Sequence, residues 1–235
     1  AGPRSPYGDA GTSVVAPHLR RHGVDRLDAV LISHSDSDHL GGLPSILRNI
    51  PVERLIMNDP LERSALVDEV EMLIDSLDVS RRAAYAGDTL SMDQSTLVHI
   101  LGPSSASRHV QDRNDASILM QLTHGQNQFL FLGDVEGDGE QWATQVYGDF
   151  LESEVIKVAH HGSVTSSAPT LVGKAALQDG LAVISASRRN PFGHPHREVV
   201  ERWRRAGAAV LATSVEGAIW VRSDGNTIAR VPWRE

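Results

Sequence analysis

The segment Ser33-His34-Ser35-Asp36-Ser37-Asp38-His39-Leu40-Gly41-Gly42 decides how the rest of the chain is interpreted. It carries two imidazoles and two carboxylates, and it follows Leu27-Asp28-Ala29-Val30-Leu31-Ile32, whose apolar, β-branched end predicts a buried strand. Alternate side chains of a strand point to opposite faces, so the four groups cannot serve one ion from an extended segment. If the chain coils after the strand, His34 and Asp36 can face one ion and the following Asp-His pair a second. This arrangement predicts a two-metal site.

Two less specific interpretations of this segment stay open. One is a solvated acidic loop in which a Ser or Asp caps the helix that Leu43-Pro44-Ser45-Ile46-Leu47 would begin. The other is a fragment of a calcium loop, which would need ligands at regular odd positions and a Glu near its end. The sequence has no Glu at that place.

The composition limits the kinds of site that the chain can build. Its 235 residues suffice for a buried core, and without a repeat or low-complexity linker we expect a single domain over residues 1–235. Cysteine is absent, which excludes a disulfide, a thiolate zinc site and a cysteine nucleophile, so any metal must be held by His, Asp or Glu. The net charge of -8 argues against broad electrostatic binding to nucleic acid but leaves room for a local basic path.

Periodicity along the chain predicts an α/β fold with mixed sheets and helices outside them. Strands are expected at 27–32, 55–57, 88–92, 96–101, 117–122, 128–132, 155–158, 182–185, 209–211, 218–221 and 227–231. Helices are expected at 12–22, after Gly42, from Leu61 to Leu77, through Trp142 and Val146, through Leu171 and Leu177, and from Glu198 to Ala206. The opening residues 1–11 are rich in turn formers and show no pattern.

Further candidate ligands follow predicted strands. Asp134 ends the apolar run Phe129-Leu130-Phe131-Leu132-Gly133, although it can also cap the next helix. His160 and His161 follow the strand at 155–158, and His194 lies in the loop after the strand at 182–185. Sites on layered α/β folds collect their residues at such strand ends. The remaining histidines are interpreted as surface residues: His18, His22, His99, His109, His124 and His196.

Read in order, these motifs resemble a known family. The order is His34-x-Asp36-x-Asp38-His39, then Gly133-Asp134, then His160-His161-Gly162-Ser163, then Gly193-His194-Pro195. It is similar to the metallo-β-lactamase fold superfamily and, more narrowly, to the C-terminal domain of the ComEC family of competence DNA-uptake proteins. The resemblance implies a four-layer αββα sandwich with mixed sheets.

The chain departs from the superfamily pattern in two ligands and at its start. Asp36 stands where the superfamily commonly has His, and Arg113-Asn114 stands where it has another His. We therefore expect His160 or His161 to supply the missing imidazole. We expect the family's opening strand hairpin to be truncated here, and from this we expect a domain cut from a longer polytopic protein, or a truncated or free-standing relative.

The resemblance and the ligand count together give the expected site. The expected metal ligands are His34, Asp36, Asp38, His39, Asp134, His160 and His194, with Asp134 bridging two ions. A carboxylate-rich set without thiolate makes manganese a competitor of zinc, so the expected cofactor is two divalent ions of either metal. The residues expected to act in the reaction are Asp38, His161, Asn114 and Ser163. His161 would protonate the leaving group, while Asn114 and Ser163 would position a phosphate oxygen. Which of His160 and His161 touches metal stays open.

These expectations lead to one leading function and two alternatives. The leading hypothesis is a metal-dependent phosphodiesterase, a nuclease acting on DNA during competence-linked uptake. One alternative is a metallo-hydrolase of a small ester, phosphoester or lactam, because a fold alone does not decide the substrate. The other is a non-catalytic, metal-stabilised module that guides DNA. The expected partners are DNA and the membrane domain of a parent protein, and the expected location is a soluble domain facing the periplasm or the cell exterior. The oligomeric state is not predicted.

Clusters of arginine offer candidate contacts to a nucleic-acid backbone. They are Arg81-Arg82, Arg188-Arg189 and Arg202-Arg204-Arg205. Each cluster can equally be a solvated face, which is the preferred interpretation for the helical third cluster.

Overall fold

The computed structural model describes residues 2–58, 63–105 and 114–232 of the chain. Three positions named above, Leu61, His109 and Arg113, lie outside the described residues. The described chain divides into an N-terminal unit, residues 2–58 and 63–84, and a C-terminal unit, residues 85–105 and 114–232. The predicted single domain and the four-layer sandwich concern both units together, and both stay predictions.

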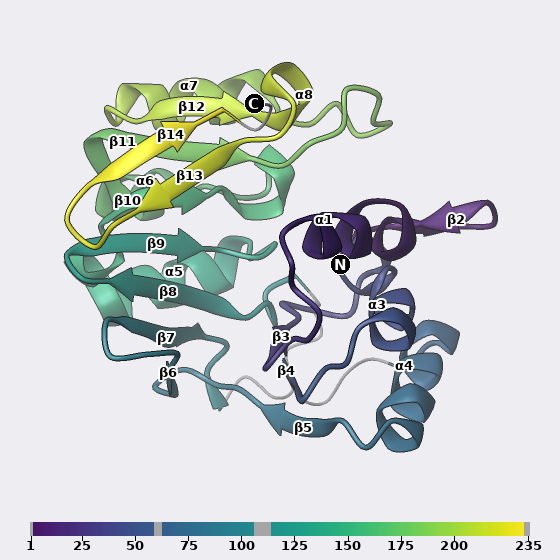
Figure 1. Cartoon of the computed structure of the whole chain (residues 1–235). Coiled ribbons are helices and arrows are strands. Elements are labelled where there is room, and N and C mark those ends of the chain that lie inside the picture. Colours follow the sequence, from purple (N-terminus) through teal and green to yellow (C-terminus); the bar gives the residue numbers. More distant parts are fainter. Residues whose placement is uncertain (1, 59–62, 106–113, 233–235) are drawn as a thin grey trace. The chain divides into compact units, whose positions relative to one another are not determined.

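The N-terminal unit is built on a three-stranded parallel sheet in the order β3-β4-β5 (Figure 1). Its strands are β3 (Val30–Leu31), β4 (Arg54–Met57) and β5 (Ser80–Ala83). The helices α3 (Leu43–Asn49) and α4 (Ala65–Ser76) connect them, as parallel strands require. Their apolar faces pack with the sheet in one core that includes Leu40, Leu43, Leu47, Leu55, Met57, Val67, Val70 and Ile74.

The expected strands at 27–32 and 55–57 and the helix after Gly42 are confirmed, but β5 was not predicted. β5 is an exposed edge strand, and its sequence Ser80-Arg81-Arg82-Ala83 is accordingly polar. This sequence therefore lacks the apolar alternation by which strands are recognised. The strand reaching His34 is shorter than expected.

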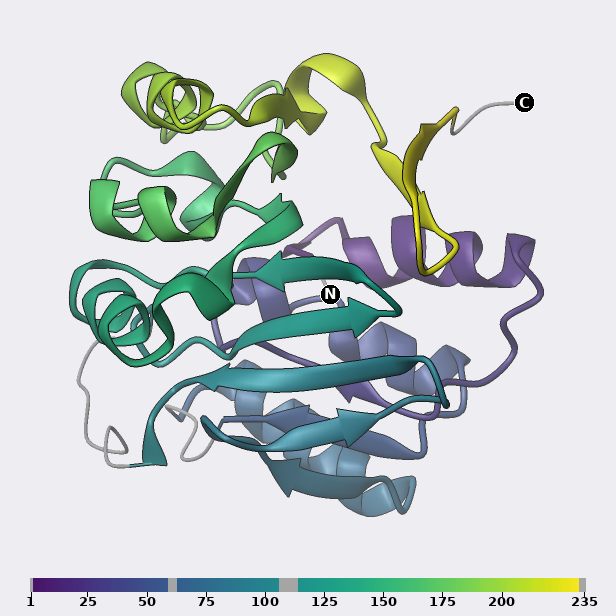
Figure 2. The same ribbon diagram turned by 90° about the vertical axis from the view of Figure 1, so that its left-hand side faces the viewer.

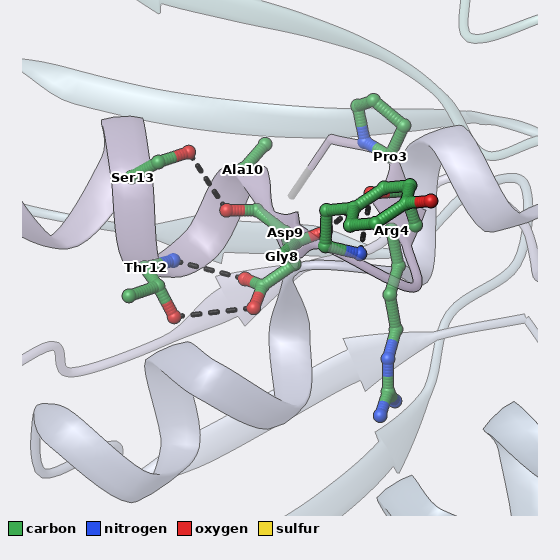
Figure 3. Close-up of a pocket in the computed structure, with 9 residues that line it drawn as sticks. Pro3, Arg4, Gly8, Asp9, Ala10, Thr12 and Ser13 are labelled. Atoms are coloured by element: carbon green, nitrogen blue, oxygen red, sulfur yellow. Dashed lines mark hydrogen bonds between the residues drawn. The ribbon is translucent and has the colours of Figure 1, made fainter.

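The start of the chain is more regular than expected. Residues 4–9 form a small hairpin of β1 (Arg4–Ser5) and β2 (Gly8–Asp9), followed by a π-helical turn at Gly11–Val15 and by α1 (Ala16–Arg21). Figure 3 shows the open hollow along this segment, in which the Asp9 carboxylate accepts hydrogen bonds from the Thr12 amide and hydroxyl at 2.9 and 3.1 Å. Asp9 also accepts from Ser45 Oγ of α3 at 2.8 Å, which fixes the hairpin to the unit.

The C-terminal unit contains a seven-stranded mixed sheet in the order β12-β11-β10-β9-β8-β7-β6. The first four strands along the chain pair antiparallel: β6 (Thr89–Ser91), β7 (Thr96–Gly102), β8 (Leu119–His124) and β9 (Asn127–Phe131). The next three continue parallel to β9: β10 (Ser153–Lys157), β11 (Ala176–Ile184) and β12 (Ala209–Ala212). A mixed α/β architecture is therefore confirmed.

The helices α5 (Gly137–Tyr147), α6 (Pro169–Ala175) and α7 (Arg197–Arg205) lie on one face of this sheet (Figure 2). Strands β9 to β12 follow one another in space as in sequence, and right-handed crossovers then place every connecting helix on the same side. The core beneath them includes Trp203, which is fully buried and donates from Nε1 to Ser167 Oγ at 3.1 Å. The prediction that α6 continues through Leu177 is wrong, because this helix ends at Ala175 and Leu177 lies in β11.

The carboxyl ends of the parallel strands β9, β10 and β11 lie next to one another, and ligands of α/β folds collect at such strand ends. A separate hairpin of β13 (Trp220–Ser223) and β14 (Ile228–Val231) is tied to the β8–β9 turn by a 2.6 Å hydrogen bond from the Gln126 amide to the Gly225 carbonyl. Among the helices in the part of the chain that the structure describes, none has the length and apolar character that crossing a membrane requires.

Candidate functional site

The N-terminal unit carries its candidate ligands in the turn after β3 and in the short helix α2 (Ser37–Leu40) that follows it. We call His34, Asp36, Asp38 and His39 the N-terminal ligand set. One hydroxyl holds both imidazoles: Ser33 Oγ lies 3.1 Å from His34 Nδ1 and 3.0 Å from His39 Nδ1. A hydroxyl oxygen has two lone pairs, so both Nδ1–H groups can donate to it. Both Nε2 atoms then carry the lone pair that a metal ligand needs.

The carboxylates of this set accompany the imidazoles in two pairs. Asp36 Oδ2 lies 3.8 Å from His34 Nε2, and Asp38 Oδ2 lies 3.9 Å from His39 Nε2. Asp36 occupies the N-cap position of α2, but its side chain makes no capping hydrogen bond. The alternative in which a Ser or Asp caps α3 is not what the structure shows, because the N-cap residue of that helix is Gly42, which has no side chain to cap it. The division of the pairs between two ions stays a prediction.

The C-terminal unit carries Asp134 after β9, His160 and His161 after β10, and His194 after β11, which we call the C-terminal ligand set. Asp134 is buried, and its amide donates to Ser117 Oγ at 3.1 Å. The alternative that Asp134 caps α5 does not hold, because the N-cap residue of that helix is Glu136. Asp134 thus presents its carboxylate from a fixed backbone.

His161 and Asp134 face each other as two metal ligands would. The Nδ1–H of His161 donates to the Ser185 carbonyl at 2.8 Å, because a carbonyl can only accept, and this leaves the lone pair of a neutral ring on Nε2. That Nε2 lies 3.3 Å from Asp134 Oδ2. Two atoms bound to one tetrahedral ion at about 2.1 Å lie about 3.4 Å apart. A nitrogen and an oxygen acceptor at this separation fit a divalent cation between them.

His160 is oriented by a carboxylate. Its Nδ1 pairs with Glu136 Oε1, which also accepts from the Thr165 hydroxyl. Its ring centroid lies 5.6 Å from that of His194. His160 and His161 both have left-handed φ angles, 43° and 52°, which non-glycine residues adopt at a cost of about 1 to 2 kcal/mol each. Strain of this kind is typical of functional sites.

His194 is held by the side chain of Asn190, whose Oδ1 accepts from the His194 amide at 2.8 Å and whose Nδ2 donates to the His194 carbonyl at 2.8 Å. Burial lowers the pKa of His194, and the neighbouring imidazoles of His160 and His196 lower it further. A neutral imidazole is the form that binds metal.

The other residues expected to act in the reaction have identifiable partners. Ser163 Oγ is hydrogen-bonded to the Thr165 hydroxyl at 2.8 Å, and the Asn114 carbonyl accepts from the Ser117 amide at 2.9 Å. Their contact with a phosphate stays a prediction. Lys157 was not predicted: its Nζ donates to the Gly133 carbonyl at 3.1 Å and lies 3.5 Å from Asp134 Oδ1.

A buried carboxylate that sequence reasoning missed supports the C-terminal ligand set. Glu140 of α5 accepts hydrogen bonds from the amides of Ser167 and Ala168, at 2.5 and 2.7 Å, at the start of α6. Burial raises the pKa of Glu140 to about 7, against the opposing effect of these two amide hydrogen bonds. The Asp115 carboxylate adds to the rise, and the Arg202 guanidinium opposes it. Glu140 thereby fixes the segment that follows His160 and His161.

Sequence signals for these supporting residues were weak. Ser33 directly precedes His34, and Glu136 comes two residues after Asp134, but a Ser or Glu beside a motif is too common to be singled out. Glu140 is one of several acidic residues near the start of α5, and only its burial distinguishes it.

The chain is similar to known proteins in sequence and in fold. Residues 9–186 match the metallo-beta-lactamase superfamily. The solved structure of the metallo-beta-lactamase fold protein YhfI from Bacillus subtilis covers 87% of this chain and 81% of its own, with a TM-score of 0.52 at 13% identity, which shows the fold.

Three curated relatives are each 30% identical to the chain. They are ComE operon protein 3 of Bacillus subtilis, Recombination protein 2 of Haemophilus influenzae and Competence protein ComA of Neisseria gonorrhoeae, over 90%, 88% and 89% of this chain. The chain spans about a quarter of the length of these relatives, covering 26%, 24% and 27% of them. The expected resemblance is confirmed. The chain belongs to the metallo-beta-lactamase superfamily, and its curated homologues are proteins of the ComEC family.

Proposed function

We propose that the chain is a metal-dependent phosphodiesterase that cleaves DNA. The observation that carries this proposal is the 3.3 Å approach of His161 Nε2 to Asp134 Oδ2 at the carboxyl ends of adjacent strands. Membership of the metallo-beta-lactamase superfamily supports a metal-dependent hydrolase, and the name of one relative, Competence protein ComA, supports a substrate met in competence.

We also propose that the two ligand sets serve one centre with two divalent ions, as the sequence predicted, so that residues 1–235 act as one domain. Each set offers two imidazoles or more with at least one carboxylate, and neither set has a thiolate. Ligands of this kind suit zinc or manganese. Bound there, divalent ions would acidify a water molecule and stabilise the charge that develops on a phosphodiester.

Within this proposal the two adjacent histidines take different roles. His161 is the better ligand, since its Nε2 faces Asp134 and its Nδ1 is fixed by the Ser185 carbonyl. His160, oriented by Glu136, is suited to deliver a proton to the leaving oxygen. This exchanges the roles that the sequence suggested. Asp38 remains a proposed ligand, and Asn114 and Ser163 remain proposed contacts to a phosphate oxygen.

We further propose that DNA is the substrate and that the chain works beside the membrane domain of a longer protein, facing the periplasm or the cell exterior. The relatives, which are about four times as long as the matched part, support this proposal.

The test is cleavage of linear single- and double-stranded DNA with manganese, with zinc and with chelator, beside the Asp38→Ala variant. Metal-dependent cleavage that the variant lacks supports the proposal. Cleavage of small phosphodiesters or esters without cleavage of DNA would favour the small-substrate hydrolase. If the chain holds two metal ions and cleaves none of these substrates, the result would favour the DNA-guiding module.

A further inference from the structure

The loop of residues 187–194, between β11 and α7, has a defined conformation although it is exposed. Asn190 closes it, because its Nδ2 donates to the carbonyls of Ser187 and His194 at 2.8 Å while its Oδ1 accepts from the His194 amide. At its base, Arg188 Nε donates to the Ser214 carbonyl at 2.9 Å. The groups that this loop presents to solvent are therefore held in place.

One of those groups is a large aromatic ring. Phe192 is 70% exposed, and its ring stacks on the His194 imidazole with centroids 5.7 Å apart and 26° between the ring planes. The stacking fixes the ring's orientation, while most of its surface stays open to solvent. Phe192 thus contributes little to the core of the unit, and its exposed surface is available to a flat partner.

The same loop carries positive charge. Arg188 and Arg189 are exposed, and among the residues that the structure describes neither guanidinium has an acidic partner. The chain as a whole has a net charge of -8, so two adjacent cations beside an exposed aromatic are a local exception. Phosphates attract such cations, and bases stack on such rings.

We propose that Phe192 is a stacking platform for one unpaired base of single-stranded DNA, with Arg188 and Arg189 contacting the flanking phosphates. This deepens the proposed function, on which it rests, by naming the strand state of the substrate. A base inside a duplex already has its faces covered by its neighbours, so only single strands or frayed ends offer a free face. Stacking beside His194 would bring the adjoining phosphodiester toward the C-terminal ligand set.

The experiment compares binding of two labelled oligonucleotides to the metal-loaded chain. One is oligothymidine, and the other is an abasic oligonucleotide of equal length and charge; both have phosphorothioate linkages that resist cleavage. The variants are Phe192→Ala and Phe192→Trp, and Tyr7→Ala is the control because Tyr7 is a fully exposed aromatic of the N-terminal unit.

Stacking on one base predicts that Phe192→Ala weakens oligothymidine binding about 10- to 100-fold, while Phe192→Trp and Tyr7→Ala bind like wild type. Abasic binding should be equal in all four proteins and should weaken in a variant with Arg188 and Arg189 both changed to Glu. Equal losses for both oligonucleotides in Phe192→Ala, or no loss for either, would overturn the proposal. So would loss of metal affinity in Phe192→Ala, since Phe192 would then act by positioning His194.

The proposed nuclease function can fail separately. If wild-type chain cleaves no DNA yet binds oligothymidine in a Phe192-dependent way, the platform stands and the nuclease does not. If wild-type chain cleaves DNA and Phe192→Ala cleaves single and double strands with unchanged KM, the nuclease stands and the platform is refuted.

Discussion

The two ligand sets are built in opposite ways. In the N-terminal unit, four candidate ligands lie within six consecutive residues, and one neutral hydroxyl, Ser33 Oγ, holds both imidazoles. In the C-terminal unit, the candidate ligands come from the ends of three strands, and each histidine has its own partner: the Ser185 carbonyl for His161, Glu136 for His160 and Asn190 for His194. The orientation of the imidazoles in the first set depends on one side chain, whereas in the second set it depends on several partners at the carboxyl ends of the strands.

We expect the largest effect on catalysis from removing the one carboxylate of the second set. Asp134→Ala removes the buried carboxylate that faces His161, and we expect kcat for a phosphodiester to fall about 10³-fold, because several kcal/mol of charge stabilisation are lost. Steady-state kinetics with manganese or zinc measures this. The control is Asp138→Ala, because Asp138 is exposed. If Asp134→Ala and Asp138→Ala had the same kcat, the proposed role of Asp134 would be contradicted.

The support of the second set should also depend on pH. The folded-state pKa of Glu140, raised to about 7 from 4.5, means that the folded chain keeps a proton which the unfolded chain releases. The unfolding free energy should therefore fall as pH rises from about 4.5 to 7, by about 3 kcal/mol from this group. Chemical denaturation across this range should show the fall in wild type and not in Glu140→Gln. The exposed Glu152→Gln variant should behave like wild type, and parallel pH profiles of wild type and Glu140→Gln would refute the assignment.

The Ser33 hydroxyl tests whether both imidazoles of the first set depend on one side chain. Ser33→Ala frees two imidazoles at once, and we expect metal affinity to fall about 10- to 100-fold, as for other groups that orient ligands. Calorimetric titration with zinc or manganese measures this loss. Ser33→Thr should retain affinity because it keeps the hydroxyl, and Ser37→Ala is the matched control. Wild-type affinity in Ser33→Ala would show that the rings need no such anchor.

The smallest effect is expected where one partner serves one imidazole. Glu136→Gln weakens the orientation of His160, and kcat for DNA should fall about tenfold. If His160 delivers a proton to the leaving oxygen, a diester with a nitrophenolate leaving group should be little affected, since that group leaves without protonation. A tenfold loss on both substrates would instead assign His160 a binding role.

The first ligand set and most elements could be predicted from sequence because their signals are local. The contiguous His and Asp motif and the alternation in β7, β8 and β9 needed no knowledge of distant residues. What escaped prediction depends on tertiary context. The polar edge strand β5 has no apolar pattern, α6 gives way to β11 at Ala176, and Glu140 is distinguished from its acidic neighbours only by burial. The pairing of His161 with Asp134 depends on the parallel register of β9 and β10.

The central claim is the proposal that ligands from both units hold one pair of ions, and counting bound metal tests it most directly. Metal per chain should be measured by elemental analysis after gel filtration, for wild type, Asp38→Ala and Asp134→Ala. We expect two ions in wild type and a loss of bound metal in both variants, since each variant removes a carboxylate from the proposed centre. Two ions retained at wild-type affinity in either variant would contradict it.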